Sequence, residues 1–230
     1  MIKCIIFDMY GTLVSTGNGS IKAAAEILHL NNQTDISPEK FYSEWKERHR
    51  ANINTLKNFV NEEEIFKKDL IGLYKKYHFK RNPLEDIKIM LKTLGCRQAF
   101  PETKNVIDSL SKKYILAIGS TSDTEPLMTD LIRNRIDIQK IFTSENMCVY
   151  KPNPAFYLKI LSSLELTPSD VLFVGDSLVD DVLGPKSVGI KTCWVNRKNL
   201  NSDKICPDFE IHNLCELFEI LEANSSDINL

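Results

Sequence analysis

The chain has 230 residues, of which 43% are hydrophobic, and its formal net charge is −2. This length allows one sizeable core and leaves room for a smaller second domain. A nearly neutral chain without a basic patch argues against a nucleic-acid-binding protein. No apolar run is long enough to span a bilayer, and no signal-peptide pattern precedes the first strand. We therefore expect a cytoplasmic protein with no membrane partner.

Six cysteines and four histidines are scattered along the chain. The cysteines form no C-x-x-C pair, so we expect core thiols in a reducing compartment rather than a disulfide framework. The histidines do not have the spacing of a zinc site. Any bound metal is therefore expected to have oxygen ligands.

The first predicted element is a strand formed by the apolar run 2–7, which ends at Asp8 and a glycine turn. Four helices with apolar residues at helical spacing follow it. Their expected starts are Gly17, Ser37-Pro38, Asn61-Glu62 and Asn82-Pro83, and the last is expected to end near Gly95. Short polar joints between them predict a helical bundle, residues 15–97, inserted after the first strand. This insertion is placed to act as a lid over the carboxyl ends of the strands.

From Pro101 onward, helices alternate with short apolar strands. The expected strands are 114–118, 141–143, 171–174, 192–195 and an edge strand at 208–211. The expected helices are 104–112, 123–133, 154–164, 181–188 and 214–221. A capping box is predicted at Ser122-Asp123-Thr124-Glu125, with Ser122 as the cap. The alternation predicts an α/β fold with a doubly wound parallel sheet, built from residues 1–14 and 98–224, with a frayed tail at 225–230.

Polar residues follow four of the predicted strands. In chain order they are Asp8, then Ser120-Thr121, then Lys151, then Gly175-Asp176 with Asp181. In a doubly wound sheet such strand ends converge on one crevice. An aspartate alone is often only a helix cap, and a lysine alone is usually solvated. Carboxylates, a lysine and hydroxyls together predict a metal-assisted site for a small anionic substrate.

These motifs resemble those of the haloacid dehalogenase superfamily of hydrolases over nearly the whole chain. The matching segments are Asp8-Met9-Tyr10-Gly11-Thr12-Leu13, Ser120, Lys151, and Gly175-Asp176 with Asp181. The helical insertion matches the helical cap of that family. The resemblance implies that Asp8 attacks the substrate and forms a covalent ester, which water then hydrolyses. It also implies that Ser120 and Lys151 steady the anion and that Thr12 supports the turn.

Two of the matching motifs point to different substrates. Most phosphatases of the superfamily have a second aspartate two residues after the nucleophile, which protonates the departing alkoxide. This chain has Tyr10 there, as in the 2-haloacid dehalogenases, whose halide leaving group needs no proton. The segment 192–197 and the pair Lys151 and Tyr157 also look like that branch. Asp176, in contrast, looks like the Mg²⁺ ligand of the phosphatases, which those dehalogenases lack.

Asp8, Asp176 and the backbone carbonyl of Tyr10 could build a Mg²⁺ site, with Asp181 behind them. A phosphoryl dianion needs a cation before a carboxylate can approach it. We therefore favour a Mg²⁺-dependent phosphatase that acts on a small phosphorylated metabolite through an aspartyl-phosphate on Asp8. An (S)-2-haloacid dehalogenase is the alternative. A weakly catalytic protein that binds a phosphorylated ligand is a second alternative.

The cap is expected to select the substrate. In the dehalogenases a cap arginine near a tryptophan binds the substrate carboxylate. Lys46 and Arg50 lie on the same predicted helix as Trp45, and either could take this role here. Each of these basic residues alone would more often belong to a solvent-exposed helix face that has no role in binding. Further candidates for substrate binding are Tyr10, Thr121 and Tyr157. The sequence leaves the substrate open, and it does not decide between a monomer and a homodimer.

Overall fold

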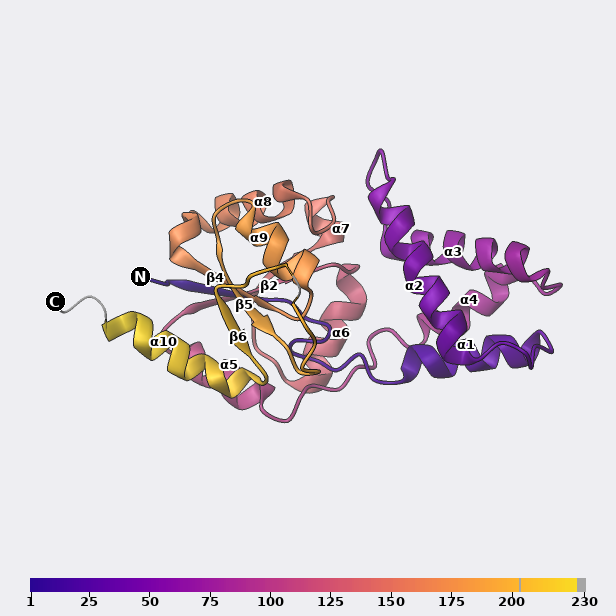
Figure 1. Cartoon of the computed structure of the whole chain (residues 1–230), viewed down its shortest axis with the longest axis horizontal. Coiled ribbons are helices and arrows are strands. Elements are labelled where there is room, and N and C mark those ends of the chain that lie inside the picture. The colour runs from indigo at the N-terminus through magenta and orange to yellow at the C-terminus, as the bar shows by residue number, and fades with distance from the viewer. Residues whose placement is uncertain (203, 227–230) are drawn as a thin grey trace.

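A computed structural model describes residues 1–202 and 204–226 (Figure 1). Six strands form one sheet in the order β3-β2-β1-β4-β5-β6, and every neighbouring pair is parallel. The strands are β1 (Cys4–Phe7), β2 (Ile115–Ser120), β3 (Lys140–Thr143), β4 (Val171–Gly175), β5 (Lys191–Val195) and β6 (Phe209–Ile211). The predicted doubly wound α/β fold is confirmed, and β6 is the expected edge strand. Because the strand order reverses at β1 and β4, Asp8 lies at the point where such folds place a crevice.

Helices cover both faces of the sheet (Figure 1). They are α5 (Thr103–Leu110), α6 (Thr124–Asn134), α7 (Ser144–Met147), α8 (Pro154–Leu164), α9 (Gly184–Lys186) and α10 (Leu217–Ser226), with short turns η1 (Pro168–Asp170), η2 (Leu178–Leu183) and η3 (Leu214–Glu216). Alternate residues of β1 explain the two layers. Ile5 and Phe7 pack in one cluster with residues of α5, α6 and α10, whereas Cys4 and Ile6 pack with residues of α8.

The inserted bundle consists of α1 (Gly19–Leu30), α2 (Pro38–Asn54), α3 (Glu62–Tyr77) and α4 (Pro83–Leu91). It has an apolar cluster of its own that includes Phe41 and Trp45. Figure 1 shows it as a separate lobe beside the sheet. The two chain segments that join the lobes pair with each other, because Ser15 N donates to Gln98 O at 2.8 Å. We call this bundle the cap and the remainder the core.

Several local expectations need correction. Ser122 does not cap α6, which begins at Thr124 with Asp123 in the cap position and without a side-chain cap bond. The single helix expected at 181–188 is instead the π-helical turn η2 followed by the short α9. Pro185 explains the break, because it has no N–H to continue a regular ladder.

Two other sequence-based expectations differ from the structure. The tail was expected to begin at 225, but α10 continues through Ser226, and 227–230 lie outside the described residues. All six cysteines are free, but only Cys4 and Cys193 are buried, so the expectation of core thiols holds for two of them. Among residues 1–202 and 204–226, no helix is both long and apolar enough to cross a membrane.

Candidate active site

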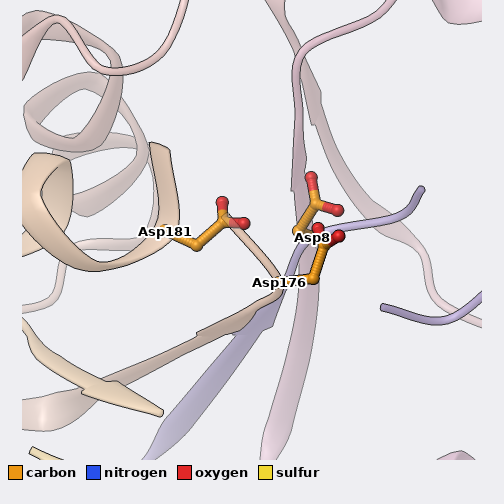
Figure 2. A group of neighbouring side chains, drawn as sticks. All are labelled: Asp8, Asp176 and Asp181. Atoms are coloured by element: carbon orange, nitrogen blue, oxygen red, sulfur yellow. The ribbon is translucent and has the colours of Figure 1, made fainter. Parts of the chain in front are cut away.

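Three carboxylates meet at the carboxyl ends of β1 and β4 (Figure 2). Asp8 follows β1, Asp176 follows β4, and Asp181 lies in η2. One carboxylate oxygen from each lies within 4.8 Å of the other two. The neighbouring parallel strands β1 and β4 place Asp8 and Asp176 side by side, as the convergence of strand ends predicts.

Lys151 is the cation of this cluster. Its Nζ donates hydrogen bonds to Asp8 Oδ1 at 2.7 Å, to Asp181 Oδ1 at 2.7 Å and to Gly119 O at 3.0 Å. Burial alone would lower the pKa of Lys151, but the charges of Asp181 and Asp8 raise it above its usual range. The buried ammonium therefore stays charged and ties the ends of β1 and β2 to η2.

Asp176 is accessible to solvent, although protein atoms crowd its carboxyl group. This crowding and the charge of Asp8 raise the pKa of Asp176 to about 7. Gly11, at a φ of +100°, makes the close approach possible, because a Cβ there would lie 2.9 Å or less from each carboxylate atom of Asp176. Within the described part of the chain, no lysine, arginine or histidine nitrogen lies within 4.0 Å of the Asp176 carboxylate.

The donor set fits a hard divalent cation. Three carboxylates face one buried ammonium, so two negative charges are unbalanced when all three are ionised. Carboxylate oxygens are the ligands that Mg²⁺ prefers in proteins. Asp8 and Asp176 are placed to hold such an ion, and Asp181 is already engaged by Lys151 and by the backbone N–H of Ser177 at 2.9 Å. The Tyr10 carbonyl remains a predicted third ligand.

Hydroxyl groups lie at the end of β2 and in the turn after β1. Ser120 is the last residue of β2, and its Oγ accepts a 3.4 Å hydrogen bond from Ser122 Oγ. The Oγ1 atoms of Thr12 and Thr121 are buried and have no hydrogen-bond partner among the described residues. Because an unpaired buried hydroxyl costs free energy, these groups are available to an anion.

The phenol of Tyr10 lies near Asp130 of α6 and Glu62 at the start of α3. Burial and the neighbouring charges of Asp130 and Glu62 raise its pKa above the usual range. Its ring packs against the core cluster that contains β1. The carboxylate of Asp130, a buried residue of α6, accepts from Arg97 N at 2.7 Å, and its charge acts on the nearby phenol.

The residues predicted to bind substrate differ in whether they reach the site. Lys46 is exposed, and its Nζ lies 5.2 Å from the centroid of the Tyr42 ring in its own helix. Arg50 crosses to the core and forms two hydrogen bonds, of 2.9 and 2.8 Å, with the carboxylate of Asp180 in η2. Tyr157 is completely buried, and its hydroxyl donates to the backbone carbonyl of Asp180. Arg50 thus reaches the site, whereas Tyr157 supports the loop beneath it.

Sequence reasoning missed two supports of the site, Asp180 and Arg197. Arg197 donates to Thr12 O at 3.0 Å, pairs with Glu102 at 2.7 Å and lies 3.6 Å from the centroid of the Phe100 ring. It therefore holds the turn after β1 from the side of β5. The adjacent pair of aspartates in η2 was a visible signal for Asp180, but no local pattern marks Arg197 as a partner of Thr12.

A cavity of about 200 Å³ opens beside Asp176. It lies between the turn after β1, which contributes Gly11, and the segment after β5, which contributes Arg197 and Lys198. The charge of Lys198 acts against the rise in the pKa of Asp176. The carboxylate cluster is therefore open to solvent on a side lined by cationic residues.

Comparisons with known proteins agree with this fold. The chain is 24% identical over 233 residues to (S)-2-haloacid dehalogenase 4A of Burkholderia cepacia, covering 97% of this chain and 96% of the relative. It is 32% identical over 125 residues to a glyceraldehyde 3-phosphate phosphatase of Pyrococcus furiosus, covering 50% and 52%. The crystal structure of YfnB from Bacillus subtilis, bound to magnesium, superposes with a TM-score of 0.81 at 21% identity, covering 96% and 99%. A family model for haloacid dehalogenase-like hydrolases matches residues 2–189, so the chain belongs to that hydrolase family.

Proposed function

We propose that this hydrolase is a Mg²⁺-dependent phosphatase of a small phosphorylated metabolite, with Asp8 as the nucleophile. Asp176 carries the proposal, because it places a second, accessible carboxylate beside Asp8. Two neighbouring carboxylates repel a phosphoryl dianion unless a cation balances them. Bound Mg²⁺ would supply that charge and polarise a phosphoryl oxygen. The magnesium-bound relative YfnB supports this choice of metal.

The remaining groups fit the roles that phosphoryl transfer requires. Lys151 holds Oδ1 of Asp8, which leaves the other oxygen free to attack phosphorus. A bond forms between Asp8 and phosphorus as the bond to the leaving oxygen breaks, and water then attacks the phosphorus and regenerates the carboxylate. The unpaired Thr121 hydroxyl and Ser120 are proposed to bind the anion during both steps.

A second candidate function is dehalogenation of a 2-haloacid. Tyr10 favours it, because the residue in the place of the usual acid is a phenol whose pKa is raised above its usual range, so it is a poor proton donor. A halide needs no proton as it leaves, so the missing acid would not matter. The relative from Burkholderia cepacia is named as such a dehalogenase. Asp176 counts against this candidate, since its negative charge beside Asp8 would repel the substrate carboxylate.

Product release with and without Mg²⁺ separates these functions. Purified protein should release phosphate from small phosphate esters only when Mg²⁺ is present, and it should release no halide from 2-chloropropionate. Halide release that persists in EDTA would reject the proposal in favour of the dehalogenase. Release of neither product, together with binding of a phosphorylated ligand, would favour the weakly catalytic binding protein. Asp8→Asn is the matched inactive control in each assay.

A further inference from the structure

The cap helix α3 begins against the loop that follows β2. The carboxylate of Asp123 accepts hydrogen bonds from Glu62 N at 2.9 Å and from Glu63 N at 3.0 Å. These are the first two N–H groups of α3, which have no partner within their own helix. A carboxylate is also favoured at the positive end of a helix of 16 residues. A residue of the core therefore caps a helix of the cap.

The residues in the cap positions of α3 and α6 do not cap their own helices. Asn61, at the cap position of α3, donates instead to Glu145 Oε1 at 2.8 Å. Asp123 holds the cap position of α6, but the first N–H of α6, that of Thr124, donates to Glu145 Oε2 at 2.7 Å. Both helix starts are therefore satisfied by carboxylates of the core, Asp123 for α3 and Glu145 of α7 for α6, and Glu145 also accepts from Asn61 of the cap.

Neighbouring contacts strengthen the same junction. Tyr150 donates a 2.9 Å hydrogen bond to Val60 O, just before α3, and its ring stacks on Phe59 with the centroids 5.3 Å apart. Arg50 and Asp180 form a second, separate link between the lobes. In the part of the chain that the structure describes, these two links join the cap to the core in addition to the connecting chain segments.

The start of α3 has another possible capping residue when the lobes are apart. Asn61 has φ and ψ of −60° and 152°, and Asp123 has −75° and 155°, so both already have the extended backbone of a helix cap. If the lobes part, Asn61 can turn to α3. Asp123 has fewer N–H groups to accept from on its own helix, because the third residue of α6 is Pro126, which has no N–H. Asp123 is therefore best satisfied when the cap is in contact with the core.

The same loop carries the hydroxyls of the candidate site. Asp123 lies three residues after Ser120, and Ser122 in between donates to Ser120 Oγ. We propose that Asp123 is a positioning residue, which fastens the start of α3 to the turn after β2 and so couples contact of the cap to the placement of Ser120 and Thr121. Docking of the cap then completes the anion site only when α3 is capped from the core.

Hydrogen exchange of the Glu62 amide tests the contact on unreacted protein, whatever reaction the enzyme performs. Asp123→Ala should speed exchange at this amide at least tenfold, because a cap side chain of α3 itself reaches only the second or third N–H. Asp123→Asn, which keeps one acceptor oxygen, should give a smaller increase. Glu125→Gln, an exposed carboxylate two residues away, is the matched control. Unchanged protection in Asp123→Ala would overturn the proposed contact.

The coupling to the site has its own measurements. In Asp123→Ala, the amides of Ser120 and Thr121 should also exchange faster. The value of kcat/KM should fall at least tenfold, and more through KM than through kcat, for whichever of p-nitrophenyl phosphate or 2-chloropropionate the parent protein hydrolyses. Asp123→Asn should restore part of the loss. Faster exchange confined to α3, with unchanged kinetics, would show that Asp123 only caps a helix.

Discussion

Lys151 and Asp8 are 143 residues apart in the chain, yet the ammonium of one donates a 2.7 Å hydrogen bond to the carboxylate of the other. The same ammonium bonds Asp181 at the same distance. Both side chains of the Lys151–Asp181 pair are only 1% exposed, so water contributes little to balancing their charges. The position of the nucleophile therefore depends on one buried cation.

Replacing Lys151 with methionine should destabilise the core by about 3 to 5 kcal/mol, because carboxylates would remain buried without their cation. Urea unfolding followed by circular dichroism measures this loss. Lys191→Met, at an exposed position of β5, should have little effect. Adding Asp181→Asn to Lys151→Met should recover part of the loss, since it removes one unpaired charge. A single variant as stable as the parent would contradict the role of Lys151.

Asp176→Asn should abolish stabilisation of the protein by Mg²⁺. In the parent protein, saturating Mg²⁺ should raise the melting temperature, since ligands that bind only the folded state stabilise it. The variant removes one of the two carboxylates placed to hold the ion, so its melting temperature should not respond. Glu219→Gln, at an exposed position of α10, is the control. A parent protein that does not respond to Mg²⁺ would remove the main support for a phosphatase.

An acid-stable phosphoryl group should be trapped on Asp8 during turnover. Brief reaction with a substrate labelled in its phosphoryl group, followed by an acid quench, should leave label on the parent protein and none on Asp8→Asn. Hydroxylamine should release the label, because it cleaves acyl phosphates. Phosphate formation without any trapped label, in a variant that lacks the Asp8 carboxylate, would mean that water attacks the substrate directly.

His49 should make the cap more stable at neutral than at alkaline pH. Burial lowers its pKa, but the 2.8 Å hydrogen bond to Asp69 and the Glu62 carboxylate 3.4 Å from Nε2 outweigh burial and raise the pKa to about 9. Because this exceeds the ordinary value of about 6.5, the added stability is complete below pH 6.5 and is lost as pH rises through 9. The shift corresponds to at most about 3 kcal/mol.

Tryptophan fluorescence can report this effect from the cap alone. The chain has two tryptophans, so a Trp194→Phe background leaves Trp45 of α2 as the only reporter. Urea unfolding between pH 6 and pH 10 should show the loss of stability in this background. His49→Gln should flatten the pH dependence, whereas His29→Gln, at an exposed position, should not. A pH dependence that survives in His49→Gln would place its origin elsewhere.

The elements of the core were predictable because apolar periodicity is a local property. Alternation of strands and helices predicted the parallel sheet, and the polar residues after β1 and β4 were expected to converge there, as Asp8 and Asp176 do. Prolines at the starts of α2 and α4 marked those helices correctly. Each of these signals depends only on residues that are close together in the chain.

Interactions between distant segments could not be predicted in this way. The pattern from Ser122 onward predicted a capping box for α6, but Asp123 instead caps α3, about 60 residues earlier in the chain. Local rules assign a cap to the nearest helix and contain no information about a second lobe. The proximity of Asp130 to Tyr10 is similar, because nothing in the sequence of α6 marks this aspartate as a neighbour of residue 10.

Tyr10→Asp should raise phosphatase activity toward alkyl phosphates, whose leaving groups need a proton. A positioned acid typically contributes about 10²- to 10⁴-fold. Aryl and acyl phosphates should gain little, since their leaving groups are stable without protonation. Loss of a half-buried ring that packs on the core should cost about 2 kcal/mol of stability, so rates should be compared per folded molecule.

Tyr10→Phe separates the new acid from the lost phenol. It keeps the ring but removes the hydroxyl that faces Asp130, so it should neither gain activity toward alkyl phosphates nor lose much stability. If Tyr10→Phe gained as much as Tyr10→Asp, release of the Asp130 carboxylate would explain the increase, and that aspartate rather than residue 10 would be the acid. Equal rates for alkyl phosphates in all three proteins would mean that protonation of the leaving group does not limit this enzyme.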